Sequence, residues 1–255
     1  MAETTFSIDK FLYRPELIEP GTVYHYIKSN IDGSYPARIF IHVRDNDHLE
    51  VLKFEKHGMD CALVQAHMDW QTFSADRLES WVLTPDGKKY PQACLSSSYT
   101  DKTCTISWQG QNDVVTVGHY PVHVYNFDFI SLNYILRHWN DPEGEVTIGI
   151  LQPNFDPDPK TIMNYEGTVL IKFLEEEEHH QQSCRKYRIG GEGLKGCDGL
   201  MWVNKSKGYI EDIEIPIADN PNWDNFKFNF ISSEQMDVRQ WTEFMDAEIG
   251  SLKAK

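Results

Sequence analysis

The sequence predicts a mainly β protein: a large antiparallel curved sheet or half-barrel of about a dozen strands, with one internal and one C-terminal helix. The first observation is a succession of short segments rich in β-branched and aromatic residues, separated by short turns. Strands joined by such turns must be antiparallel, since parallel crossovers need about a dozen residues or more. The second is an aromatic share of 13%, which suits wide, half-buried pleated surfaces.

The strands are predicted from alternation and turn residues. Residues 22–31 are β-branched and aromatic and end at Asp32-Gly33, a hairpin signal. In residues 37–44, apolar side chains alternate from Ala37 to Val43 on one face. We expect further strands at residues 48–56, 60–71, 78–84, 103–109, 114–125, 145–152, 166–177, 183–190, 199–204, 208–217 and 225–232.

Two segments have helical spacing instead. Residues 127–139 form the internal helix, with Asp128 as its cap and Asp141-Pro142 as its stop. Residues 233–252 form the C-terminal helix, with Ser232 and Gln235 as a capping box. Its apolar stripe is expected to cover a sheet face: Trp241, Phe244, Met245, Ile249 and Leu252.

The chain organisation is predicted to be one domain, residues 1–255, in which the Pro-rich stretch 153–159 is a long loop between strands of the same character. The longest apolar runs are only a few residues, too short to form a transmembrane helix. The start has no basic and apolar leader, so we expect a cytoplasmic protein. Free thiols are expected from five cysteines without a Cys-x-x-Cys pair: Cys61, Cys94, Cys104, Cys184 and Cys197.

The second half of the chain resembles the lipoprotein-carrier-like superfamily, which includes LolA, LolB and the violacein-pathway enzyme VioE. The matching pieces are a strand at 114–125, a helix around 131–137, and the strand-turn series 184–215 with Gly-Leu-Met-Trp-Val-Asn at 199–204. The resemblance covers about residues 20–232 and implies a half-barrel wrapped around a helix, with an apolar cavity between them. Without a visible signal peptide or lipid-attachment cysteine, it favours a soluble pocket for small-molecule chemistry over lipoprotein carriage.

Candidate catalytic residues lie in the strand predicted at 117–125. A period of two places His119, His123 and Tyr125 on one face, where they could exchange protons near neutral pH. The opposite face would bring Tyr120 to a ligand. Two histidines four residues apart on a strand are separated by about 13 Å, too far to share a metal ion. The alternative is a pair of surface histidines beside a proline bulge.

A second candidate pair is His67 with Asp69, two residues apart on one strand face, where the carboxylate could orient the imidazole. The alternative is a solvated polar face. Trp70, on the opposite face, and Trp202 are candidate pocket walls. Arg188, in the only basic cluster, could receive a ligand carboxylate, although pairing with neighbouring acidic residues is the simpler expectation.

Several chemistries are not indicated. The run Glu175–Glu178 followed by His179-His180 is expected to be a surface turn without a third metal ligand. We therefore predict no metal and no cofactor. The glycines at 190–193 do not form a phosphate loop, and neither Gly-x-Ser-x-Gly nor a Rossmann alternation is present.

The predicted partner is a small apolar or aromatic molecule. A net charge of −15 argues against nucleic acid and anionic membrane surfaces, and no membrane insertion is expected. The first hypothesis is a cofactor-independent biosynthetic enzyme, of cyclase, isomerase or dehydratase type. The alternatives are a non-catalytic carrier of a lipid or pigment, which needs an apolar cavity lining, and an acidic protein-interaction module. A homodimer is left open.

Overall fold

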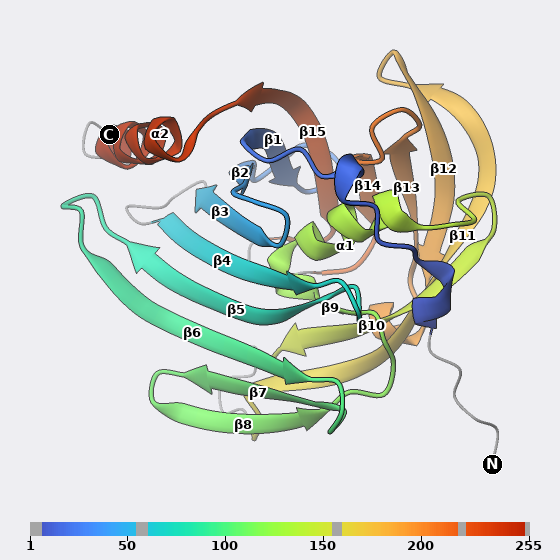
Figure 1. The fold of residues 1–255 in the computed structure, drawn as a ribbon, viewed down its shortest axis with the longest axis horizontal. Coiled ribbons are helices and arrows are strands. Elements are labelled where there is room, and N and C mark those ends of the chain that lie inside the picture. The colour runs from blue at the N-terminus through green and yellow to red at the C-terminus, as the bar shows by residue number, and fades with distance from the viewer. Residues whose placement is uncertain (1–6, 55–60, 155–159, 219–222, 253–255) are drawn as a thin grey trace.

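The computed structural model describes residues 7–54, 61–154, 160–218 and 223–252, which form a curved sheet around a short central helix (Figure 1). The sheet has 15 strands. Their bounds are β1 Thr22–Ser29, β2 Ala37–Val43, β3 His48–Phe54, β4 Cys61–Asp69, β5 Ser74–Leu83, β6 Lys89–Ser98, β7 Thr103–Trp108, β8 Gln111–Thr116, β9 Val122–Val124, β10 Glu145–Pro153, β11 Met163–His179, β12 Gln182–Gly190, β13 Asp198–Asn204, β14 Ile210–Ile215 and β15 Phe226–Gln235.

The strand order shows two arms that meet in the middle of the sheet. In one arm, the strands β1 to β8 lie side by side in chain order. In the other arm, the strands from β15 to β9 lie side by side in reverse chain order, and β1 pairs with β15. All pairs are antiparallel except β9 with β10. Just before β11, the Ile162 N–H donates to Asp113 Oδ2 at 3.0 Å, which links β8, the last strand of one arm, to the third strand from the end of the other arm. The predicted mainly β, largely antiparallel class is confirmed.

The central helix α1 (Ile130–Ile135) lies on the concave side of the sheet, between the 3₁₀ turns Tyr125–Phe127 and Leu136–His138 (Figure 1). All six of its residues are buried. Asn133 fixes its position, because its side chain accepts the Ile210 N–H at 2.7 Å and donates to the Tyr26 hydroxyl at 2.9 Å. Because the oxygen and the nitrogen of this buried amide are both hydrogen-bonded, it holds the helix in one position against the sheet.

Helix α2 (Val238–Ser251) packs on the opposite face of the sheet, against a second apolar cluster. Trp241 is fully buried there and stacks on His42, with ring centroids 5.1 Å apart. The predicted stripe therefore does cover a sheet face. The predicted capping box is wrong: β15 continues to Gln235, which pairs with Thr22, and the helix begins at a capping box of Asp237 and Gln240. The backbone partners offered by β1 extend the strand past Ser232.

Strand β6 (Lys89–Ser98) was not predicted. Pro91 and three consecutive serines weaken its sequence pattern, yet it pairs along its length with β5 and β7. Pro91 lies beside a register irregularity, where a missing N–H is tolerated.

The predicted strand 114–125 is also wrong as one unit. β8 ends at Thr116, residues 117–121 leave the sheet with a cis peptide bond before Pro121, and β9 has three residues. His119, Tyr120 and His123 are all buried, because this segment packs against β10, against Ser74 of β5 and, at His123, against Ser131 of the central helix. Alternation on a period of two therefore does not separate its faces.

Asp128 does not cap the internal helix. Its backbone is left-handed, the residue at the helix start is Phe129, and no side chain caps that end. The predicted 13-residue helix is shortened accordingly, because the Asp128 carboxylate is bonded to lysines of the sheet instead.

Much of the predicted loop 153–159 lies outside the described residues. Within the described ranges, no helix has the length and apolarity needed to span a bilayer.

Candidate functional site

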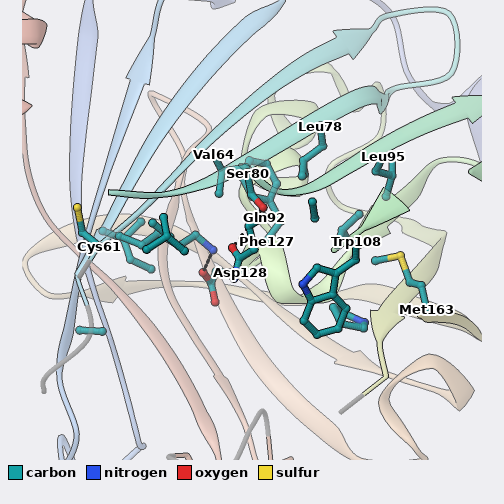
Figure 2. Close-up of a pocket in the computed structure, with 18 of the residues that line it drawn as sticks. Cys61, Val64, Leu78, Ser80, Gln92, Leu95, Trp108, Phe127, Asp128 and Met163 are labelled. Carbon is teal, nitrogen blue, oxygen red and sulfur yellow. Dashed lines mark hydrogen bonds and ion pairs between the residues drawn. The ribbon is translucent and has the colours of Figure 1, made fainter. Parts of the chain in front are cut away.

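A cavity of about 560 Å³ lies inside the first arm of the sheet, in front of the segment that leads into α1 (Figure 2). Its volume falls in the range of about 300–1,000 Å³ that is usual for small-molecule sites. Its lining is mostly apolar and comes chiefly from β2 to β7. The described lining residues are Lys28, Ala37, Ile39, Lys53, Phe54, Cys61, Ala62, Val64, Leu78, Ser80, Val82, Gln92, Ala93, Leu95, Ile106, Trp108, Val124, Phe127, Asp128, Pro153, Ile162, Met163 and Trp223.

The cavity exists because small side chains face one another across the strands. Val64 on β4 is paired with Ser80 on β5, Ser80 with Ala93 on β6, and Ala93 with Trp108 on β7. Directly paired residues of antiparallel strands share a face. A row of valine, serine and alanine fills less of the interior than leucine or phenylalanine would, and Trp108 forms the wall at the end of the row (Figure 2).

Charged groups gather in one part of the lining. Asp128 is joined through Oδ1 to Lys28 Nζ at 2.7 Å and through Oδ2 to Lys53 Nζ. Burial alone would raise the pKa of Asp128, but the two lysines outweigh it and hold the pKa below its ordinary value. Among the described lining residues, these three are the only charged ones.

Aromatic rings surround the lysines of this group. Lys28 Nζ lies 4.5 Å from the ring centroid of Trp223, and Lys53 Nζ lies 5.5 Å from that of Phe127. Both ammonium groups thus meet aromatic rings on one side and a carboxylate on the other, an arrangement that stabilises cations away from bulk water. The cavity combines an apolar wall with one polar end.

The sequence signal that could have indicated the polar end of the cavity is a lysine on an otherwise apolar strand face. Lys28 follows Tyr24 and Tyr26 on the inward face of β1, and Lys53 follows Val51 on the inward face of β3. The third member, Asp128, was assigned to a helix cap. Small residues at the paired positions Ser80 and Ala93 are a second such signal.

His119, His123 and Tyr125 are all buried, His119 against β10 and the other two beside the central helix. His119 Nε2 lies 3.1 Å from the Thr147 carbonyl oxygen, and His123 Nδ1 lies 2.5 Å from Ser131 Oγ. Burial lowers the pKa of His119 and brings that of His123 down to about 3. Both imidazoles are therefore neutral near pH 7. Tyr125 packs edge-on against Phe129 at 5.0 Å between ring centroids.

His67 and Asp69 point to different partners. His67 is exposed and stacks on His48 at 4.3 Å between centroids. The Asp69 carboxylate accepts the Gln71 N–H and the Thr72 hydroxyl, both at 2.9 Å. No contact between His67 and Asp69 is found among the hydrogen bonds of the described residues.

The four predicted ligand-binding residues are dispersed over the fold. Trp70 stacks on Tyr13 at 5.0 Å, and the Tyr120 hydroxyl lies 3.3 Å from Ser97 Oγ. Arg188 is exposed and bonded to Asp198, as the simpler expectation had it. Trp202 is buried under the β11–β12 turn. None of the nine predicted site residues is among the described residues lining the cavity, and their proposed roles stay predictions.

A separate cluster of ligating groups lies at the β11–β12 turn. His179 Nε2 and His180 Nε2 lie 3.1 and 3.4 Å from Asp212 Oδ2 on β14. The histidine pair was expected to have no third ligand nearby, and that expectation is wrong: the fold brings Asp212 to it from 32 residues further along the chain.

The comparisons with known proteins concern the fold alone. The structure is similar to the crystal structure of a Vibrio parahaemolyticus domain named for outer membrane lipoprotein sorting, with a TM-score of 0.32 and 10% sequence identity over 90% of this chain and 91% of that one. No protein-family model matches the sequence, and no curated protein matches it.

Proposed function

We propose that this protein is a non-catalytic carrier of a small amphiphile, a molecule with one apolar chain and one polar end. The observation that supports it best is the composition of the described cavity lining: apolar side chains come from six neighbouring strands, and among the described lining residues only Lys28, Lys53 and Asp128 are charged. A carrier needs this distribution, because an apolar chain gains about 25 cal/mol for each Å² removed from water and needs no directional contacts.

The position of the polar end follows from the same lining. The apolar part of the ligand lies along the row Val64, Ser80 and Ala93, and its polar group reaches Lys28 and Lys53. An ammonium group has three N–H donors, so a lysine bonded to Asp128 can also donate to a ligand carboxylate. Charge-assisted hydrogen bonds of this kind are worth about 1.5–3 kcal/mol.

The experiment compares two probes of one chain length, a long-chain fatty acid and the matching fatty alcohol, titrated into protein stripped of bound lipid. We expect saturable binding of both probes, with the acid bound more tightly. Lys53→Met should weaken binding of the acid about 10-fold, the equivalent of one charge-assisted bond, and change binding of the alcohol little.

Lys172→Met is the matched control, because Lys172 carries an exposed ion pair with Glu145 and lies outside the described cavity lining. It should bind both probes as the natural protein does. If neither probe binds, the carrier proposal is wrong. If both bind but Lys53→Met weakens them equally, the polar end has been placed wrongly while the cavity remains the binding site.

The enzyme hypothesis has its own test. It rests on His119, His123 and Tyr125, and it requires that His123→Ala lower turnover of a ligand roughly 10²-fold while leaving its affinity nearly intact. A small molecule that is chemically altered on incubation with the protein would favour it over the carrier. The interaction-module hypothesis would instead be favoured by a protein partner bound with no ligand in the cavity.

A further inference from the structure

The cluster of His179, His180 and Asp212 lies away from the cavity, on the other face of the sheet. Asp212 alternates on β14 with Ile213, which belongs to the core around the central helix, so the Asp212 side chain points to the opposite face. His179 ends β11, and His180 has a left-handed backbone in the tight turn that follows. The turn thus lays two imidazoles over one carboxylate.

The separations match the geometry of a bound metal ion. Ligands that each lie about 2.0–2.1 Å from a tetrahedral ion are about 3.3–3.4 Å apart. Asp212 Oδ2 lies 3.1 Å from His179 Nε2 and 3.4 Å from His180 Nε2. The three ligand atoms all lie within 4.8 Å of one another, so a small movement of the exposed His180 ring would complete one face of a coordination shell.

Asp212 is an unusual residue to find beneath a surface turn. Its side chain is 1% exposed, and its Oδ1 accepts no hydrogen bond from any described residue. A buried carboxylate with an unsatisfied oxygen is unfavourable unless a cation compensates for it. Lys227 Nζ, 3.4 Å from Oδ2, supplies part of that compensation, but it is held more closely by Glu214 at 2.6 Å.

The surroundings favour a cation that arrives from solvent. The His179 ring is stacked on Trp202, with centroids 4.2 Å apart and planes 9° apart, so its orientation is set before any ion binds. His180 is 52% exposed and leaves a path for the ion.

The geometry points to a binding site for a divalent transition-metal ion of the zinc class, held by His179 Nε2, His180 Nε2 and Asp212 Oδ2. Two imidazole nitrogens and one carboxylate oxygen are ligands that zinc accepts, and three protein ligands leave further positions for water. Each imidazole binds in its neutral form with Nε2 deprotonated. The site would tie the β11–β12 turn to β14.

The test is a titration of chelator-treated, full-length protein with Zn²⁺ in competition with a chromophoric chelator. We expect about one tightly bound ion per chain, the number that a single such site can hold. His180→Ala should weaken binding at least about 10-fold. This ring is exposed, so its loss should not disturb folding. Lys227→Gln should strengthen binding several-fold, because it removes the cation that competes for Asp212.

His67→Ala is the matched control. His67 also stacks on a second histidine, His48, but the described residues bring no third ligating group to that pair. Its removal should leave Zn²⁺ affinity unchanged. The proposal is overturned if no tight Zn²⁺ binding is seen, or if His180→Ala binds Zn²⁺ as well as the natural protein. It is equally overturned if His67→Ala alone abolishes binding.

Discussion

The two arms of the sheet enclose their interiors differently. In the arm from β10 to β15 and the adjoining β1, large side chains fill the space beside the central helix: Tyr26 of β1 stacks on Phe228 of β15 at 4.1 Å, and Trp139 packs on Tyr187 of β12 at 5.6 Å between centroids. No described residue of β12 to β15 lines the cavity. In the arm from β2 to β7, the row Val64, Ser80 and Ala93 lines the cavity, and Figure 2 shows Val64 and Ser80 at its wall.

The comparison shows that the curvature of the sheet creates an interior space. The volume of the side chains then determines which part of this space stays empty. The central helix is tied to the filled arm through Asn133, which accepts the Ile210 N–H of β14 at 2.7 Å, and Arg137, in the turn after the helix, donates to the Tyr24 hydroxyl of the adjoining β1 at 2.9 Å. With the helix fixed on that side, the small side chains opposite are not covered. The filled arm supports the fold, and the hollow arm is available to a ligand.

The largest effect on stability is expected from truncating a leucine to alanine. The same truncation is compared in the central helix and in the cavity wall. Leu132→Ala, in the fully buried central helix, should lower the free energy of unfolding by about 3–5 kcal/mol. Leu95→Ala, in the cavity wall, should lower it by less, about 2 kcal/mol, because this side chain already borders space and forfeits fewer contacts. Urea unfolding of both variants checks the comparison. Equal losses would show that the two arms are packed alike.

The filled arm should also make the protein sensitive to mild acid. Burial lowers the pKa of His123 to about 3, and burial together with Arg137 and Arg14 lowers that of His138 to about 4. Between these values and about 6.5 the unfolded chain binds more protons than the folded one, so stability falls as the pH drops below about 6.5. Each histidine contributes up to about 1.4 kcal/mol per pH unit.

His123→Gln isolates this contribution. The variant should start less stable at pH 7.5 but lose stability less steeply between pH 6.5 and 4.5, a range that ends above the ordinary pKa values of aspartate. Chemical denaturation at several pH values in this range gives the slope. A slope unchanged from that of the natural protein would mean that His123 is protonated in the folded state as readily as in the unfolded one.

Much of the sheet could be predicted from the sequence, because alternation and turn residues are local. The strand Ala37–Val43 and its turn at Asp45–Asp47 follow from them. β6 was missed because Pro91 and its serines are poor strand residues, and pairing on both sides overrides them.

The cavity could not be predicted in the same way, because its polar end is assembled from distant positions. Asp128 is 100 residues from Lys28 and 75 from Lys53, and no local pattern links them. Of the histidines with suggestive spacing, His123 packs against the central helix, His119 lies against β10, and His67 is exposed. Asp212 reaches His179 over 33 residues through the pairing of four strands, which local spacing does not encode.

The smallest effect on stability is expected in α2. It sharpens the contrast between this helix and the central helix α1. No side chain caps α1, and it depends on being buried, whereas α2 is capped by Asp237, whose carboxylate accepts the Gln240 N–H at 2.8 Å. Asp237→Ala should therefore lower stability by about 1 kcal/mol, the usual value of an N-cap. Thermal unfolding of the variant measures it. A loss as large as that of Leu132→Ala would mean that the outer helix carries far more of the fold.

The central claim, that the hollow arm is a ligand site, is tested most directly by filling it. Ala93→Trp places an indole in the cavity, and Cys94→Trp places the same indole on the adjacent residue of β6, which is exposed and points the other way. Fatty-acid affinity is measured for both variants. We predict that Ala93→Trp weakens binding at least about 10-fold at unchanged stability, while Cys94→Trp binds normally. Normal binding by a folded Ala93→Trp protein would contradict the account.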